Sequence, residues 1–315
     1  MDLHNSSKKN IKPFVKWVGG KGQILENIFK YFPKKINNYY EPFLGGGAVF
    51  MKLLDKIEKK EIILNGKMYL NDSNKNLIMT YKNIKENVND LIKKLTKYNK
   101  YYLKAKFRTL PSRTKINVNI DEKIQDVIKK GRQHVYYFYR NKFNNDLKIT
   151  DVEKSALFIF LNKTGFRGLF REGKNGFNVP FGNYDKPNIC EKNLLINLNI
   201  LFNKYNVEFL DTDFKDIFDS VDSGDFVYFD SPYYPLNNKS FVAYQKLGFT
   251  EENHSELANI CVILDELKIK FLESNSNCQN NKITYKDFII KEIYAKRRIN
   301  SKNPNQKEME LLIYN

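Results

Sequence analysis

The stretch Glu41-Pro42-Phe43-Leu44-Gly45-Gly46-Gly47 joins a strand-like segment to a helix-like segment, and it decides the fold class. Residues 38–43 have the pattern of a strand end, residues 48–57 that of a helix, and residues 67–72 that of a second strand. Glycine at a strand end lets a ligand approach the backbone closely. We therefore predict an α/β fold whose glycine turn borders a site for a nucleoside-containing cofactor.

Asp72 ends the second of these strands, where a carboxylate can accept hydrogen bonds from ribose hydroxyls. A helix N-cap on residues 73–81 is an alternative role for Asp72, and the two roles are compatible. A glycine-rich turn alone is as often a tight turn as a ligand site. The assignment therefore depends on the turn and Asp72 together.

The second informative motif is Asp230-Ser231-Pro232-Tyr233, which follows an apolar, strand-like segment at residues 225–230. A carboxylate and the backbone carbonyl of Ser231 can accept the hydrogens of a planar amino group. An aromatic ring such as that of Tyr233 can stack on the heterocycle that carries this group. The four residues are therefore candidate catalytic residues for chemistry on a nucleobase.

Positive charge is concentrated in the middle of the chain. Residues 81–195 carry 25 Lys and Arg against 11 Asp and Glu, a net +14 of the total +17. An AT-rich genome would raise the lysine content everywhere, whereas a polyanionic partner accounts for an excess confined to one segment. We predict that this segment binds nucleic acid.

The sequence pattern that indicates secondary structure changes twice along the chain. Residues 81–160 have a helical pattern, and residues 162–187 are rich in Gly, Asn and Phe, which indicates a hairpin and loops. Alternating strands and helices then resume, with strands expected at 207–210, 225–230, 268–272 and 309–314 and a helix at 251–267. We predict one discontinuous α/β domain, residues 1–80 and 196–315, interrupted by an insertion at 81–195.

Several classes of protein are disfavoured. The chain has no apolar run of about 20 residues and no secretory signal at its start, so we expect a cytoplasmic protein without a membrane partner. Cys190, Cys261 and Cys278 are far apart and lack metal-ligand spacing, so no metal site is expected.

Six segments, in this order, resemble the DNA adenine-N6 methyltransferases of the Dam type, the alpha-order class of amino-methyltransferases. The resemblance extends over nearly the whole chain. The segments are Lys16-Trp17-Val18-Gly19-Gly20-Lys21, Glu41-Pro42-Phe43-Leu44-Gly45-Gly46-Gly47, Asn162-Lys163-Thr164-Gly165-Phe166-Arg167-Gly168-Leu169-Phe170-Arg171, Phe177-Asn178-Val179-Pro180-Phe181-Gly182, Asp230-Ser231-Pro232-Tyr233 and Ser240-Phe241-Val242-Ala243-Tyr244.

The resemblance implies a Rossmann-like S-adenosylmethionine-dependent methyltransferase fold with a mainly helical, basic target-recognition insertion that carries a β-hairpin. It implies that residues 1–80 and 196–315 form the catalytic domain and that the product of the cofactor is S-adenosylhomocysteine. Asp213 and Phe214 match the place where the family holds the cofactor's adenine. The other matching cofactor positions are Trp17, Lys21, Gly45, Gly46, Gly47, Asp72 and Asp230. A tryptophan packed in the core is the alternative for Trp17.

The same resemblance implies double-stranded DNA as the partner, with the target adenine flipped out of the duplex and stacked on Tyr233. The positions that match base-contacting residues are Lys16, Phe166, Arg167, Leu169, Arg171 and Pro180. The family precedent for this hairpin favours the sequence GATC. Loop packing is the alternative for the two apolar positions 169 and 180, and a phosphate contact is the alternative for either arginine.

Two residues depart from the family pattern: Ser231 replaces a usual proline, and Arg167 replaces a common asparagine. The alternatives are therefore a DNA-binding protein of the same fold with lost or weak catalysis, or methylation of another planar amine, namely cytosine N4, an RNA base or a protein glutamine. A companion restriction endonuclease is possible. We expect a monomer or weak dimer; a monomer can act on each strand of a palindrome in turn.

Overall fold

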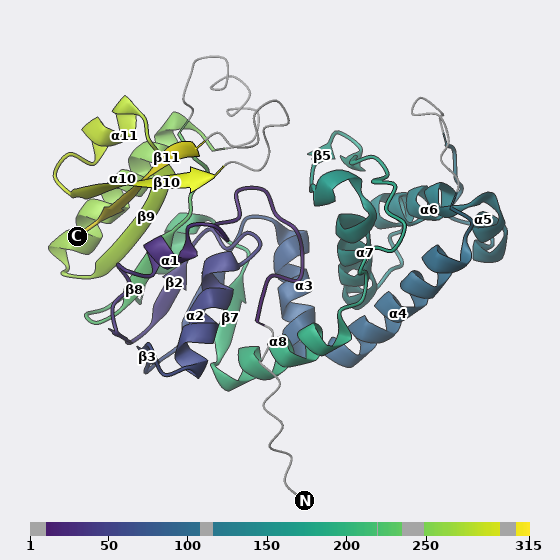
Figure 1. The fold of residues 1–315 in the computed structure, drawn as a ribbon, viewed down its shortest axis with the longest axis horizontal. Helices are drawn as coiled ribbons and strands as arrows, with labels where there is room; N and C mark the ends of the chain where they lie inside the picture. Colours follow the sequence, from purple (N-terminus) through teal and green to yellow (C-terminus); the bar gives the residue numbers. More distant parts are fainter. Residues whose placement is uncertain (1–10, 108–115, 219, 235–248, 297–306) are drawn as a thin grey trace, which may run out of the picture. The chain divides into compact units, whose positions relative to one another are not determined.

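The computed structural model describes residues 11–107, 116–218, 220–234, 249–296 and 307–315. Backbone contacts divide the chain into two compact units (Figure 1). Unit 1 consists of Met1–Gly20 and Asn74–Lys204, and unit 2 consists of Lys21–Ser73 and Tyr205–Asn315. The motif at residues 240–244 lies outside the described residues.

Unit 2 contains a seven-stranded sheet in the order β10-β11-β9-β8-β2-β4-β7. Five of its strands, β9, β8, β2, β4 and β7, are parallel neighbours, whereas β11 runs antiparallel to β9 and β10. The predicted α/β class is confirmed, and the central sheet is mostly parallel. The strands span β2 Tyr39–Glu41, β4 Met68–Asn71, β7 Val207–Leu210, β8 Phe226–Phe229, β9 Lys270–Ser276, β10 Ile289–Lys296 and β11 Lys307–Tyr314.

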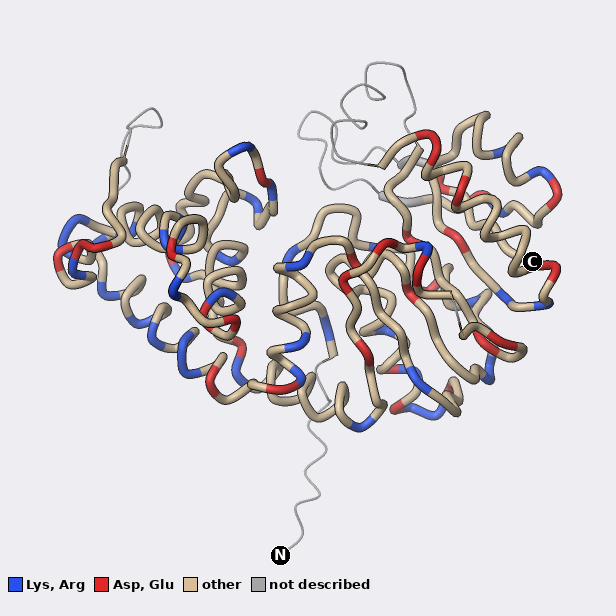
Figure 2. The backbone as a smooth tube through the Cα atoms, turned by 180° about the vertical axis from the view of Figure 1, so that it is seen from behind, with Lys and Arg blue, Asp and Glu red and all other residues tan. Residues whose placement is uncertain are grey.

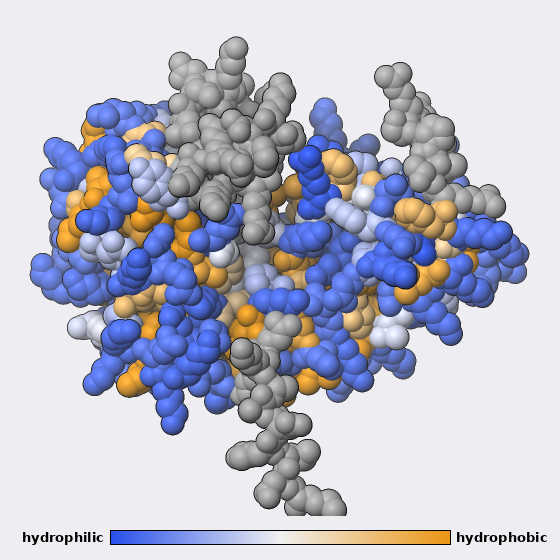
Figure 3. Space-filling view, in the orientation of Figure 1, coloured by the Kyte–Doolittle hydropathy of each residue, from blue (hydrophilic) through white to orange (hydrophobic). Residues whose placement is uncertain are grey.

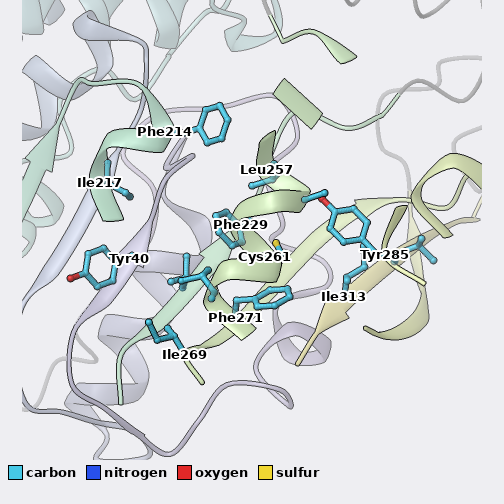
Figure 4. Close-up of a cluster of buried hydrophobic side chains, with 14 residues drawn as sticks. Tyr40, Phe214, Ile217, Phe229, Leu257, Cys261, Ile269, Phe271, Tyr285 and Ile313 are labelled. Atoms are coloured by element: carbon cyan, nitrogen blue, oxygen red, sulfur yellow. The ribbon is translucent and has the colours of Figure 1, made fainter. Parts of the chain in front are cut away.

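Alternating side chains of β8 face the two sides of this sheet, because successive residues of a strand point to opposite faces. The rings of Phe226 and Tyr228 pack against Phe32. Val227 and Phe229 belong to a buried cluster on the other side, which includes residues of α10 such as Cys261 (Figure 4). The remaining elements of unit 2 are α1 Leu25–Ile28, β1 Lys35–Ile36, α2 Ala48–Glu58, β3 Ile63–Leu64, η2 Phe214–Phe218, α10 Glu251–Glu266 and α11 Gln279–Thr284.

The strand order places the carboxyl ends of β8, β2, β4 and β7 along one edge of the sheet. The chain passes from β2 to β4 and β7, and then returns to the other side of β2 as β8. The ends of β2 and β8 are therefore a topological switch point, where open parallel sheets bind their ligands. The glycine turn follows β2, and Asp230 follows β8.

Unit 1 is mainly helical, and its helix α7 is buried on nearly all sides. Nine of the 14 residues of Asp151–Thr164 are buried, and Thr150 caps the helix by accepting a hydrogen bond from the Glu153 N–H. Helices α3, α4 and α6 pack against α7. The elements are α3 Lys75–Glu86, α4 Val88–Lys104, α5 Ile124–Lys130, α6 Arg132–Asn145, α7, η1 Phe166–Gly168, β5 Glu172–Gly173, β6 Gly176–Phe177 and α8 Lys192–Lys204.

Lysine and arginine recur along the helices of unit 1 (Figure 2). On α4, exposed lysines stand at spacings of four, three and four residues, which places Lys93, Lys97, Lys100 and Lys104 on one side of the helix. Hydrophilic residues cover much of the face shown in Figure 3. Within the described part of the chain, no helix has the length and apolar character needed to cross a membrane.

The main differences from the predicted elements lie near the C-terminus. Strand β10 was not predicted, and β9 covers Lys270–Ser276 rather than residues 268–272. The last residues of β9, Glu273, Ser274, Asn275 and Ser276, are polar in sequence and yet only 0–6% exposed. A run of buried polar residues hides a strand from hydrophobic periodicity, because that method expects apolar residues at buried positions.

Candidate active site

Asp230 forms an ion pair with Lys21 at the carboxyl end of β8. Lys21 Nζ lies 2.5 Å from Asp230 Oδ1, and the side chains of Lys21 and Asp230 are 6% and 22% exposed. Burial raises the pKa of Asp230, the positive charge of Lys21 opposes that rise, and the negative charge of Glu310 adds to it. The proton affinity of this carboxyl therefore depends on two charged neighbours.

Tyr233 is contacted both at its hydroxyl group and at its aromatic ring. Its hydroxyl donates a hydrogen bond of 2.6 Å to Glu310 Oε2 on β11, and Lys21 Nζ lies 4.5 Å from the centre of its ring. Burial, followed by the charges of Asp230 and Glu310, raises the pKa of Tyr233 well above its usual value. The hydroxyl therefore remains a hydrogen-bond donor, and the ring has a defined position.

The glycine turn is shaped by left-handed backbone conformations and by Asp72. Gly45 has φ of 49°, and Gly47, the N-cap of α2, has φ of 69°. The Gly45 N–H donates a hydrogen bond of 2.8 Å to Asp72 Oδ2. The alternative role for Asp72 as a helix N-cap is wrong, because α3 begins at Lys75 and Asn74 caps it by accepting from the Leu77 N–H.

Asp213 and Phe214 lie at the start of η2 with contrasting environments. Asp213 is exposed and accepts a hydrogen bond from the Lys215 N–H. Phe214 is 7% exposed, and its ring packs against Phe43 at 5.2 Å and Phe249 at 5.7 Å between centroids. The aromatic neighbours of Phe214 were not predicted as site residues, although Phe43 stands inside the quoted glycine segment.

Glu41 is another residue of this region that sequence reasoning left unassigned. It is 2% exposed and accepts a hydrogen bond of 2.7 Å from the Tyr39 hydroxyl. Burial raises the pKa of Glu41 well above its usual value, the bond from Tyr39 opposes this, and the charges of Asp230 and Asp72 add to it. The sequence signal that could have identified Glu41 was its position at the end of a predicted strand, directly before the glycine turn.

Trp17 and Lys16 belong to unit 1. The Trp17 ring stacks on Phe170, with centroids 5.9 Å apart and an angle of 20° between the planes. The Asn162 amide Nδ2 donates to the carbonyls of Lys16 and Gly168, each at 2.8 Å, and its Oδ1 accepts from the Lys16 N–H at 2.9 Å. Asn162 thus joins the Lys16 backbone to the Gly168 loop of the hairpin region, residues 162–187.

The hairpin region presents several of its side chains to solvent. Strands β5 and β6 form a two-stranded antiparallel pair, and Arg171 Nε donates 2.6 Å to Asn178 Oδ1 across it. The Phe166 N–H donates 2.8 Å to the Pro180 carbonyl. Among the positions matched to base contacts, Leu169 is half-buried and the others are exposed, namely Lys16, Phe166, Arg167, Arg171 and Pro180.

The predicted site residues therefore fall into two groups. Unit 2 contains Lys21, Gly45, Gly46, Gly47, Asp72, Asp213, Phe214, Asp230, Ser231, Pro232 and Tyr233. Unit 1 contains Trp17 with Lys16, Phe166, Arg167, Leu169, Arg171 and Pro180. Across the residues that the structure describes, no group of three or more His, Cys, Asp or Glu side chains could hold a metal ion.

A mostly parallel sheet with a glycine turn and an acidic, aromatic turn at its switch point is typical of enzymes that use a nucleoside cofactor. Residues 17–299 match the family described as D12 class N6 adenine-specific DNA methyltransferase. Since this match covers most of the chain, the protein belongs to that family. It is thus an adenine-specific DNA methyltransferase.

Curated relatives agree with this assignment. The chain is 39% identical to "Type II methyltransferase M.MjaIII" of Methanocaldococcus jannaschii, over 97% of this chain and 99% of the relative. It is 32% identical to "Type II methyltransferase M1.LlaDCHI" of Lactococcus lactis subsp. cremoris, over 100% and 99%. It is 30% identical to "DNA adenine methylase" of Haemophilus influenzae, over 94% and 90%.

Proposed function

We propose that this enzyme transfers the methyl group of S-adenosylmethionine to N6 of an adenine that is flipped out of duplex DNA, within the sequence GATC. The observation that carries the proposal is the arrangement of Asp230, Lys21 and Tyr233 at the end of β8. It combines a carboxylate acceptor with an aromatic ring in a fixed position. The amino group of a target base needs the carboxylate as an acceptor, and a base taken out of the DNA stack needs the aromatic ring.

The residues of unit 2 fit the cofactor that the family implies. The glycines have no side chains to exclude a ligand from the end of β2, and the exposed Asp213 beside the buried Phe214 offers an acceptor and an aromatic surface. Lys21, Asp72 and Asp230 provide charged groups near the same strand ends. When bound, S-adenosylmethionine supplies a methyl group already activated by a positively charged sulfur.

Asp230 and the Ser231 carbonyl would accept the two N6 hydrogens of the target adenine. The N6 nitrogen gains positive charge as it takes the methyl group, and a carboxylate beside it stabilises that charge. Tyr233 would hold the base in line, because correct placement of the reacting atoms lowers the barrier further. The Lys21 ammonium keeps the Asp230 carboxyl from becoming too basic, since it opposes the effect of burial on its pKa.

Target selection would use the exposed side chains of the hairpin region. Arginine can bind guanine O6 and N7 with two hydrogen bonds, and apolar side chains can contact a thymine methyl group. Arg171 is already oriented by Asn178, which reduces the entropy lost on forming such a contact. The exposed lysines of unit 1 would add affinity through phosphates without adding sequence information.

The test is nucleoside mass spectrometry on duplexes that differ only in the presence of GATC, after incubation with enzyme and S-adenosylmethionine. N6-methyladenine confined to the GATC duplex is the expected result. Its formation in both duplexes would remove the GATC assignment and keep the reaction. N4-methylcytosine, or methylation of RNA alone, would show that the proposed substrate is wrong. Salt-sensitive DNA binding with no methylated base would identify a binding protein with lost catalysis.

A further inference from the structure

The backbone directly after Tyr233 is held by two side chains from the end of β9. The Tyr234 N–H donates a hydrogen bond of 3.2 Å to Asn275 Oδ1, and Ser276 Oγ donates one of 2.7 Å to the Tyr234 carbonyl. Both polar groups of one residue are thus satisfied by a neighbouring strand's side chains. Such a pair of bonds fixes the position and the orientation of the peptide chain at that residue.

The orientation of Asn275 is in turn fixed by Glu273. Asn275 Nδ2 donates 2.8 Å to Glu273 Oε1, and Asn275 Oδ1 also accepts 2.8 Å from the Ser276 N–H. The amide cannot be reversed without losing these bonds, because its oxygen faces donors and its nitrogen faces a carboxyl group. Glu273 and Asn275 are 0% exposed, so water cannot substitute for a lost partner.

Burying the acidic side chain of Glu273 in the sheet costs folding free energy. It pairs in register with Phe229 on one side and Ile313 on the other, in the middle of the sheet. Its carboxyl group is hydrogen-bonded to Tyr285, which is labelled in the buried cluster of Figure 4. An apolar residue would avoid the cost of burying an acid. It would also leave the amide of Asn275 without an acceptor.

Ser231 connects this arrangement to the turn at residues 230–233, the proposed catalytic turn. Its Oγ is buried and makes no hydrogen bond of normal geometry with any described residue, although it is close enough to Glu273 to lower the pKa of that carboxyl. A proline at this position would restrict the turn through its ring. Because this chain has serine instead, the turn depends more on contacts from neighbouring strands.

We propose that Asn275 and Ser276, oriented by Glu273, are positioning residues that clamp the Tyr234 backbone and thereby place the Tyr233 ring for the target adenine. The inference rests on the proposed role of Tyr233 in stacking the flipped base. In this proposal the Asn275–Ser276 clamp contacts the Tyr234 backbone rather than the substrate or the cofactor. It acts through the catalytic turn, so its loss affects the bound-base geometry rather than the affinity for DNA.

Two serines of β9 provide a matched test. Ser276→Ala removes the bond to the Tyr234 carbonyl, whereas Ser274→Ala removes another buried hydroxyl, which pairs with Tyr228 OH at 2.8 Å. We expect S276A to lower kcat by about tenfold, and Asn275→Ala by up to about a hundredfold, with KM for DNA unchanged. S274A should keep kcat near the wild-type value. Equal losses in S276A and S274A, in proportion to stability, would overturn the proposal.

A probe of the base distinguishes positioning from general damage. 2-Aminopurine at the target adenine reports its environment by fluorescence, and its spectrum in the complex should change in S276A and N275A but not in S274A. Unchanged spectra in both clamp variants would overturn the proposal. If N275A does not fold, the serine pair decides. Adenine methylation by the wild-type enzyme is measured separately, so the proposed function can stand while the clamp fails.

The role of Glu273 is tested by exchanging the donor, Asn275, and the acceptor, Glu273, of their hydrogen bond. Asn275→Asp keeps the acceptor for Tyr234 but places two acids together, whereas the double variant E273Q/N275D restores a donor opposite the acceptor. We expect the double variant to recover kcat relative to N275D. A double variant no more active than N275D would overturn the orienting role of Glu273.

Discussion

Lys21 Nζ lies 2.5 Å from Asp230 Oδ1 and 4.5 Å from the centre of the Tyr233 ring. One cation thus contacts both the acidic and the aromatic member of the turn at residues 230–233. Burial and the charge of Glu310 raise the pKa of Asp230, and Lys21 lowers it. The pKa of Asp230 therefore depends on burial and on the opposing charges of Lys21 and Glu310. Removing the charge of Lys21 should raise this pKa, and removing the charge of Glu310 should lower it.

Asp230→Asn should reduce kcat by at least about 100-fold, because the amide keeps the shape of the side chain and loses the charge that stabilises a developing cation. Methyl transfer to a GATC duplex and DNA affinity would be measured together. Glu266→Gln is the matched control, since Glu266 is exposed on α10. Full activity in D230N would remove Asp230 from the mechanism.

Lys21→Gln should move the acid limb of the pH profile to higher pH. The positive charge of Lys21 lowers the pKa of Asp230, so its removal lets burial raise that pKa further and the carboxylate forms at higher pH. The rate would be measured across pH at saturating S-adenosylmethionine. Lys34→Gln, at an exposed position, should leave the profile unchanged. A K21Q profile that coincides with wild type would contradict the electrostatic coupling.

Glu310→Gln should move the same limb to lower pH, because it removes a negative charge that raises the pKa of Asp230. Tyr233→Phe is the informative comparison. It breaks the 2.6 Å bond between the Tyr233 hydroxyl and Glu310 while leaving the charge of Glu310 in place. A limb that shifts in Y233F as much as in E310Q would show that ring placement, and not charge, sets the profile.

Glu273→Gln should make stability less dependent on pH. Burial raises the pKa of Glu273 from its ordinary value of 4.5 to about 7, while its hydrogen bonds with Tyr285 and Asn275 and the nearby Ser231 hydroxyl oppose the rise. The contribution of this group is fully present below pH 4.5 and is lost as pH rises through 7. Between pH 4 and pH 8 the wild type should lose roughly 3 kcal/mol more unfolding free energy than E273Q. Chemical denaturation at both pH values measures the difference, and parallel losses would refute it.

Arg167→Ala and Arg171→Ala should weaken discrimination at individual base pairs by about 1–3 kcal/mol if each arginine reads a guanine. Lys174→Ala, at an exposed position of the same hairpin, is the control. Methylation rates on single-substitution duplexes, with the salt dependence of binding, would be compared. An arginine that contacts only phosphate would instead lower affinity for all sequences equally and reduce the salt slope.

Local patterns in the sequence predicted the elements whose amphipathic character is strong. Helix α10 lies within one residue of the predicted 251–267, and β7 coincides with residues 207–210. Strand β10 was missed, and the end of β9 was missed because its buried residues are polar. Periodicity registers apolar burial, so it cannot detect polar side chains that are buried because they bond to one another.

By itself the sequence determined the motifs, their order, the concentration of positive charge and the α/β class, because these follow from residue identity and short-range spacing. Only the tertiary structure decided which residues surround the turn at residues 230–233. Lys21 arrives from the start of unit 2, Glu310 from β11, and Asn275 from β9. Such contacts form when strands far apart in sequence become neighbours in one sheet, and the free energy of burying their side chains depends on that arrangement.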